Sequence, residues 1–64
     1  MQDIDVWRTA GLMVKRYGKD AVIESAKRAD DLMAVGDLDG QRVWLRVLKA
    51  IEELTDEKPS AQPN

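Results

Sequence analysis

The sequence contains no cysteine and no histidine among its 64 residues. The missing cysteines exclude disulfide bonds, thiol nucleophiles and thiolate metal sites. The missing histidines exclude Ser-His-Asp and Cys-His catalytic sites and remove the side chain most used for proton transfer near neutral pH. The two serines, Ser25 and Ser60, lie outside any G-x-S-x-G motif. Because the remaining polar groups need a deep pocket to become catalytic, we expect neither an enzyme nor a cofactor in a chain of this size.

Long hydrophobic runs are also missing. The longest uninterrupted apolar runs span only a few residues, so no membrane-spanning segment is predicted. Residues 1–5 carry neither a basic nor an apolar region, which argues against a signal peptide and favours a cytoplasmic protein. Ten basic and twelve acidic residues give a net charge of −2. This charge argues against strong non-specific nucleic-acid binding and leaves room for a local basic face.

The hydrophobic pattern predicts an all-α fold. No segment alternates with a period of two, so no strand is expected, and three segments have helical periodicity. We predict a three-helix bundle over residues 1–54, in which the second and third helices form an antiparallel hairpin. Residues 55–64 hold two prolines and almost no apolar side chain, which is typical of a disordered tail.

The first predicted helix covers residues 5–17. Asp3 or Asp5 can cap its N-terminus, and Gly18 follows its last residue, where a left-handed conformation favours glycine. At 100° per residue, the apolar side chains fall within an arc of about 120°. The members of this arc, all expected in the core, are Val6, Trp7, Ala10, Met13, Val14 and Tyr17.

The second predicted helix covers residues 20–35, beginning at Asp20 or Lys19. Its apolar stripe consists of Val22, Ala26, Ala29, Leu32 and Met33. Three inward-facing residues are small, namely Ser25, Ala26 and Ala29. Small side chains allow helices to approach closely, so we expect this helix to be the central one, in contact with both others. Ion pairs at i,i+4 spacing are predicted between Glu24 and Arg28 and between Lys27 and Asp31.

A short turn predicts the hairpin. Gly36 suits the end of the second helix, and Asp37 suits the N-cap of the third, which covers residues 38–54. Gly40 is unfavourable within a helix, and we expect Trp7 or Tyr17 to pack against it. The apolar stripe of the third helix consists of Val43, Trp44, Val47, Leu48, Ile51 and Leu54.

The two tryptophans, Trp7 and Trp44, lie inside these apolar stripes. We interpret both as core anchors, rather than as a pair of rings that stacks a ligand or a base. A core of this size gives a single domain only marginal stability, so a homodimer is an alternative to a monomer.

Two leucines flanked by basic residues are the predicted partner-binding sites. Leu12 lies on the polar side of the first helix, and Leu45 lies opposite the apolar stripe of the third helix. The basic residues beside them are Arg8 and Arg16 for Leu12, and Arg42, Arg46 and Lys49 for Leu45. We therefore predict a protein-interaction or regulatory module that docks through an apolar anchor with a basic rim.

The sequence leaves two alternative functions open and argues against a metal site. A small nucleic-acid-associated factor would use Arg42, Arg46 and Lys49, whereas an inhibitor protein of a mobile genetic element rests on chain length alone. The carboxylates lack the spacing of a calcium loop, and helix capping accounts for two of them, so no metal site is predicted. These carboxylates are Asp30, Asp31, Asp37 and Asp39.

A set of residues at fixed spacing connects the three segments. It comprises Trp7, Tyr17–Gly18, Arg28 with Leu32, Gly36–Asp37 with Gly40, Trp44, and finally Ala50 and Leu54. The set resembles small stand-alone bacterial proteins catalogued as a domain of unknown function. In these proteins a tryptophan on the first helix, a His-Gly or Tyr-Gly turn and a Gly-Asp-x-x-Gly-x-x-x-Trp segment recur. The resemblance covers about three-quarters of the chain and implies a compact helical fold without indicating an activity.

Overall fold

The computed structural model describes residues 3–55, and throughout this range the chain is helical apart from the turn at residues 35–37. Helix α1 covers Asp3–Tyr17, a 3-10 turn (η1) covers Gly18–Asp20, α2 covers Ala21–Ala34, and α3 covers Leu38–Thr55. No strand occurs among these residues, which confirms the all-α prediction. Of the predicted tail, only Thr55 is described, as the last residue of α3, and residues 56–64 lie outside the described range.

The helix ends differ little from those predicted. Asp3 and Asp5 both lie in the first turn of α1, rather than one of them preceding it. Gly18 has a φ of 58°, as expected for a glycine that ends a helix. Asp20 is the N-cap of α2, but its side chain makes no capping hydrogen bond.

The connection between α2 and α3 has the predicted chemistry. Gly36 has a φ of 83°. The N–H of Gly36 donates to the carbonyl of Met33 at 3.0 Å, and the N–H of Asp37 donates to that of Leu32 at 2.8 Å. This pair of bonds is the Schellman arrangement that satisfies the last carbonyls of a helix. Asp37 then caps α3, because its Oδ1 accepts from the N–H of Gly40 at 2.9 Å.

The neighbours of Gly40 are not the predicted ones. A Cβ placed at this position would lie 2.6 Å from Oδ2 of Asp37 and 3.1 Å from Cδ1 of Leu32. The expectation that Trp7 or Tyr17 packs there is therefore wrong. Gly40 makes room for the capping carboxylate of its own turn and for a side chain of α2.

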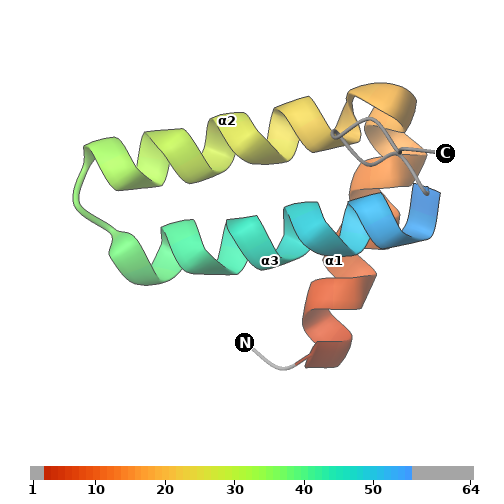
Figure 1. Cartoon of the computed structure of the whole chain (residues 1–64), viewed down its shortest axis with the longest axis horizontal. Helices are drawn as coiled ribbons and strands as arrows, with labels where there is room; N and C mark the ends of the chain where they lie inside the picture. Colours follow the sequence, from red (N-terminus) through yellow and green to blue (C-terminus); the bar gives the residue numbers. More distant parts are fainter. Residues whose placement is uncertain (1–2, 56–64) are drawn as a thin grey trace, which may run out of the picture.

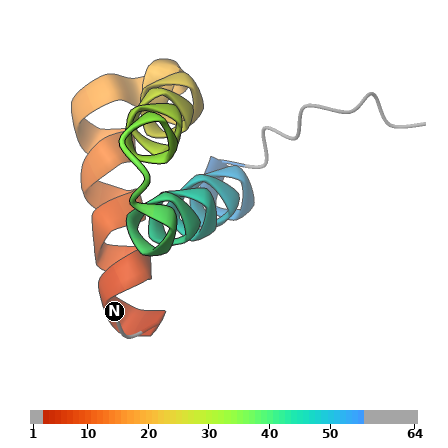
Figure 2. The ribbon, with the colours of Figure 1, turned by 90° about the vertical axis from the view of Figure 1, so that its left-hand side faces the viewer.

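The helices form an antiparallel hairpin of α2 and α3, with α1 lying across one face of it (Figures 1 and 2). The close packing of α2 on α3 was expected from the short turn. However, α3 is the central helix, because α1 contacts α3 far more than it contacts α2. The prediction that the second helix is the central one is therefore wrong, whereas its predicted contact with both other helices is confirmed.

The hydrophobic core lies where α1 crosses the hairpin. Its buried members are Val6, Ala10 and Met13 from α1, Ala21 from α2, and Val47, Ala50 and Ile51 from α3. Trp44 packs against this cluster and is half-buried, whereas Trp7 is 45% exposed. The prediction that Trp7 is a core anchor is wrong. Its position at the edge of the apolar arc of α1 explains why, since a crossing helix buries only the middle of its stripe.

Two further residues of the predicted stripes, Met33 on α2 and Leu54 on α3, are also exposed. Met33 lies in the last turn of α2, next to the hairpin turn, and Leu54 lies in the last turn of α3. The small residues Ala21, Ser25 and Ala29 are buried along α2, while Ala26 is half-buried. No helix of the described range is long and apolar enough to cross a membrane.

Candidate interaction groove

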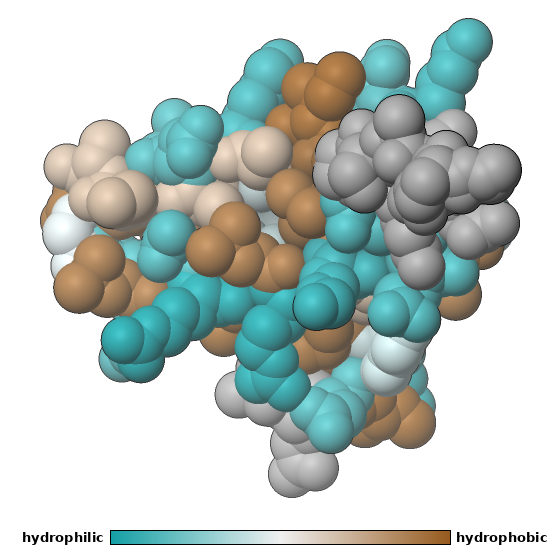
Figure 3. Space-filling model, viewed as in Figure 1, coloured by the Kyte–Doolittle hydropathy of each residue, from teal (hydrophilic) through white to brown (hydrophobic). Residues whose placement is uncertain are grey.

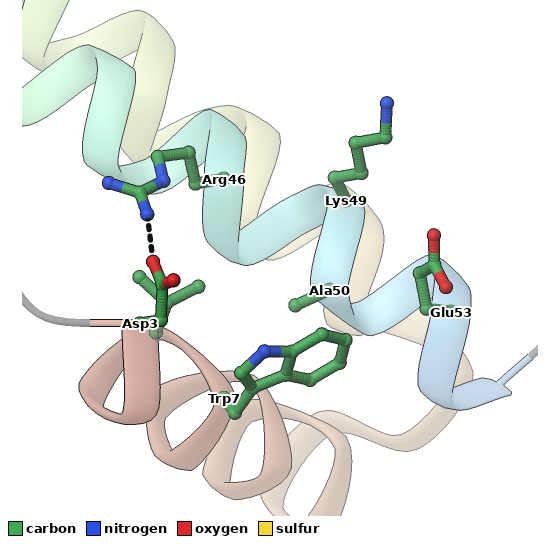
Figure 4. Close-up of a pocket in the computed structure, with 7 residues that line it drawn as sticks. Asp3, Trp7, Arg46, Lys49, Ala50 and Glu53 are labelled. Carbon is green, nitrogen blue, oxygen red and sulfur yellow. Dashed lines mark hydrogen bonds and ion pairs between the residues drawn. The ribbon is translucent and has the colours of Figure 1, made fainter.

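An open groove separates the first two turns of α1 from the second half of α3. Its volume is about 330 Å³. We call it the Trp7 groove, and it is lined by Asp3, Val6 and Trp7 from α1 and by Arg46, Lys49, Ala50 and Glu53 from α3. Figure 4 shows the indole of Trp7 lying beneath α3, with Arg46 and Glu53 to either side of it and the Lys49 side chain extending away from it.

The floor of the groove is apolar. Val6 and Ala50 are both buried in the core, and Trp7 follows Val6 directly on α1. Consecutive residues of a helix point about 100° apart. Burial of Val6 under α3 therefore holds Trp7 at the flank, where 45% of its surface faces solvent.

One end of the groove is closed by an ion pair between α1 and α3. Nη2 of Arg46 donates to Oδ1 of Asp3 (Figure 4). Both side chains are more than half exposed, so this pair contributes at most about 1 kcal/mol to stability. Its effect on the groove is electrostatic, because each charge is neutralised by the other.

The other two charges of the rim, Lys49 and Glu53, are one helical turn apart on α3. Within residues 3–55 neither of them forms an ion pair, although Glu24 and Arg28, at the same spacing on α2, approach to 3.6 Å. Both side chains are exposed. With two acidic and two basic residues in its lining, the groove carries no net charge.

The seven residues predicted to bind a partner are all exposed, but they do not form one surface. Arg46 and Lys49 line the Trp7 groove, and Leu45 and Arg42 lie on α3 outside its lining. Arg8, Leu12 and Arg16 lie on α1, also outside the lining. Leu12 is 67% and Leu45 is 44% exposed, so both leucines are at the surface as expected.

Sequence reasoning missed Asp3, Trp7 and Glu53 as groove residues. Asp3 and Trp7 are four residues apart on α1, on the same side of the helix, and this spacing is the signal that could have grouped them. No local pattern could have joined them to Arg46, which is 43 residues further along the chain.

Trp44 belongs to a different cluster, which brings together one residue from each of the three helices. The guanidinium of Arg28 lies 5.3 Å from the ring centre of Trp44 and 5.7 Å from that of Tyr17. Nη2 of Arg28 also donates to the hydroxyl of Tyr17 at 3.3 Å. These distances are typical of cation–π contacts. The cluster connects the end of α1 to α2 and α3, which is a structural role.

Among residues 3–55, no group of three acidic side chains lies close enough to hold a metal ion. Asp37 is used as a helix cap, and Asp30, Asp31 and Asp39 are exposed. The Trp7 groove, in contrast, combines an exposed aromatic ring, an apolar floor and a polar rim.

No family model, curated protein or solved structure matches the chain. The resemblance to small bacterial helical proteins therefore stays an expectation.

Proposed function

We propose that residues 1–54 form a three-helix, non-enzymatic protein-interaction module that binds its partner through the Trp7 groove. The observation that carries this proposal is the exposure of Trp7, which leaves 45% of its surface in solvent although the chain has only two tryptophans. A tryptophan in an apolar groove is the residue type most enriched among the energetic hot spots of protein interfaces.

The lining of the groove favours a protein partner over a nucleic acid. Binding to phosphates requires basic side chains that are free to replace counterions. Arg46 is neutralised by Asp3, and Glu53 lies one turn from Lys49. An apolar centre with a balanced polar rim is typical of protein–protein interfaces.

The partner would insert an apolar side chain between Trp7 and Ala50. The gain comes from removing the indole and the inserted side chain from water, while Lys49 and Glu53 select complementary charges at the rim. Leu12 with Arg8 and Arg16, and Leu45 with Arg42, stay as further candidate contact surfaces of the same module.

Selection of peptides from a displayed random library against the immobilised full chain tests this proposal. We expect the selected peptides to share an apolar residue. Their affinity for the Trp7→Ala variant should be at least about tenfold weaker than their affinity for the wild type. Ile23→Ala is the matched control, since it removes an exposed apolar side chain of α2 outside the groove, and binding should stay within about twofold. A library that yields no ligand dependent on Trp7 would contradict the proposal.

A further inference from the structure

The core of the described domain is small for its length. Ala10, Ala21, Ala29 and Ala50 make up half of the eight buried hydrophobic residues, and the largest fully buried side chain is that of Ile51. Domains near 60 residues bury only about 60% of their unfolded surface and are marginally stable. Burying more apolar surface in an assembly is one of the ways in which such small domains gain stability.

The surface next to the Trp7 groove offers apolar area for such an assembly. Ile4, which precedes Trp7 by one turn of α1, is 59% exposed, and Leu54, which follows Glu53 on α3, is also exposed. Figure 3 shows that hydrophobic side chains also gather near the hairpin turn and along α2 and α3. The Trp7 side combines its apolar residues with a groove and with two rim charges that form no ion pair within residues 3–55.

The charges of the rim are self-complementary. In a dimer with twofold symmetry, every contact occurs twice with the two roles exchanged. If two copies of α3 run antiparallel across the axis, Lys49 of each copy faces Glu53 of the other. Four residues of a helix span about 6 Å. A twofold axis that passes between these two turns of α3 therefore brings both Lys49–Glu53 pairs together at once.

From these observations we infer that the occupant of the Trp7 groove is a second copy of this chain. The inference rests on the proposed function, because it takes the groove to be a protein-docking site, and it adds the identity of the partner. The two copies form reciprocal Lys49–Glu53 ion pairs beside the twofold axis and bury the exposed part of Trp7 next to these pairs. A standard interface requires about 800 Å² from each partner, roughly one-sixth of the 4764 Å² surface of the chain.

The reciprocal pairing allows a charge-reversal test by sedimentation equilibrium of the full chain, from about 10 µM to about 1 mM, at low salt. The wild type should be dimeric at the upper concentrations. Lys49→Glu places two acidic residues against two acidic residues, and Glu53→Lys places two basic against two basic, so each single variant should dimerise at least about tenfold more weakly.

An equimolar mixture of the two variants should dimerise again. In the mixed dimer, one variant carries acidic side chains at both positions 49 and 53 and the other carries basic side chains at both, so both pairs are attractive. Asp30→Lys is the matched control, because it reverses an exposed charge on α2 outside the groove lining and should leave the dimer intact. Circular dichroism of each variant verifies that the helices are retained.

A wild type that stays monomeric at about 1 mM would overturn the inference, as would a mixture that associates no better than either variant alone. The proposed function would survive either result if peptides dependent on Trp7 are selected. A dimer that tolerates both charge reversals and Trp7→Ala would also overturn the inference, because the two copies would then meet elsewhere.

Discussion

At the scale of the residue, Ser25 shows how tightly α2 packs. Its side chain is fully buried, and its hydroxyl oxygen has no hydrogen-bond partner within the described residues. A buried hydroxyl without a partner loses the hydrogen bonds that it makes to water in the unfolded chain. Its neighbours on the same face, Ala21 and Ala29, are apolar and equally buried. The small volume of serine, and not its polarity, therefore accounts for its place in this stripe.

We predict that Ser25→Ala raises the free energy of unfolding by about 1 kcal/mol, because it removes the unsatisfied hydroxyl and improves helix propensity. Chemical denaturation monitored by circular dichroism measures the change. Thr9→Ala is the control, since the hydroxyl of Thr9 donates to the carbonyl of Asp5 at 2.8 Å and its removal should give no more than the propensity difference. A less stable Ser25→Ala would show that the hydroxyl does have a partner.

At the scale of the element, two helical glycines have opposite surroundings. Gly11 lies in α1 with nothing within 4 Å of an added Cβ, whereas a Cβ at Gly40 would collide with Asp37 and approach Leu32. The carboxylate of Asp37 that would be displaced is the one that caps α3. The two positions thus separate helix propensity from local packing.

Gly11→Ala should stabilise the fold by about 1 kcal/mol, since alanine is that much better than glycine inside a helix. Gly40→Ala should not stabilise the fold. The free energy lost by displacing the Asp37 cap is about as large as the gain in helix propensity, and the close contact with Leu32 lowers stability further. Urea unfolding of the two variants gives both values. Equal stabilisation at both positions would mean that Asp37 does not cap α3 in solution.

Local chemistry made much of each element predictable. The Gly36–Asp37 turn and the end of α1 at Gly18 follow from residues that lie next to each other in the chain. The ion pair between Glu24 and Arg28 is present, but Lys27 pairs with Glu24 at 3.5 Å, and no pair with Asp31 occurs in the described part of α2. Long exposed side chains have several partners in reach, so spacing alone does not select among them.

At the scale of the whole molecule, the way in which the helices cross determines features that local sequence patterns do not predict. Periodicity gives the direction of the apolar stripe within each helix, but it does not give the angle at which two stripes meet. For this reason the all-α class was predictable, while the central position of α3 and the exposure of Trp7 were not. The Trp7 groove depends on the same crossing, since it joins residues from the two ends of the described chain.

The central claim is that Trp7 faces solvent in the isolated chain and becomes buried on binding. Acrylamide quenching of the Trp44→Phe variant tests it most directly, because Trp7 is then the only tryptophan. At high dilution we expect red-shifted emission and strong quenching, as for a half-exposed indole, and at high concentration blue-shifted emission and protection from acrylamide. Protection already at high dilution would contradict the account, since it would place Trp7 in the core of the monomer.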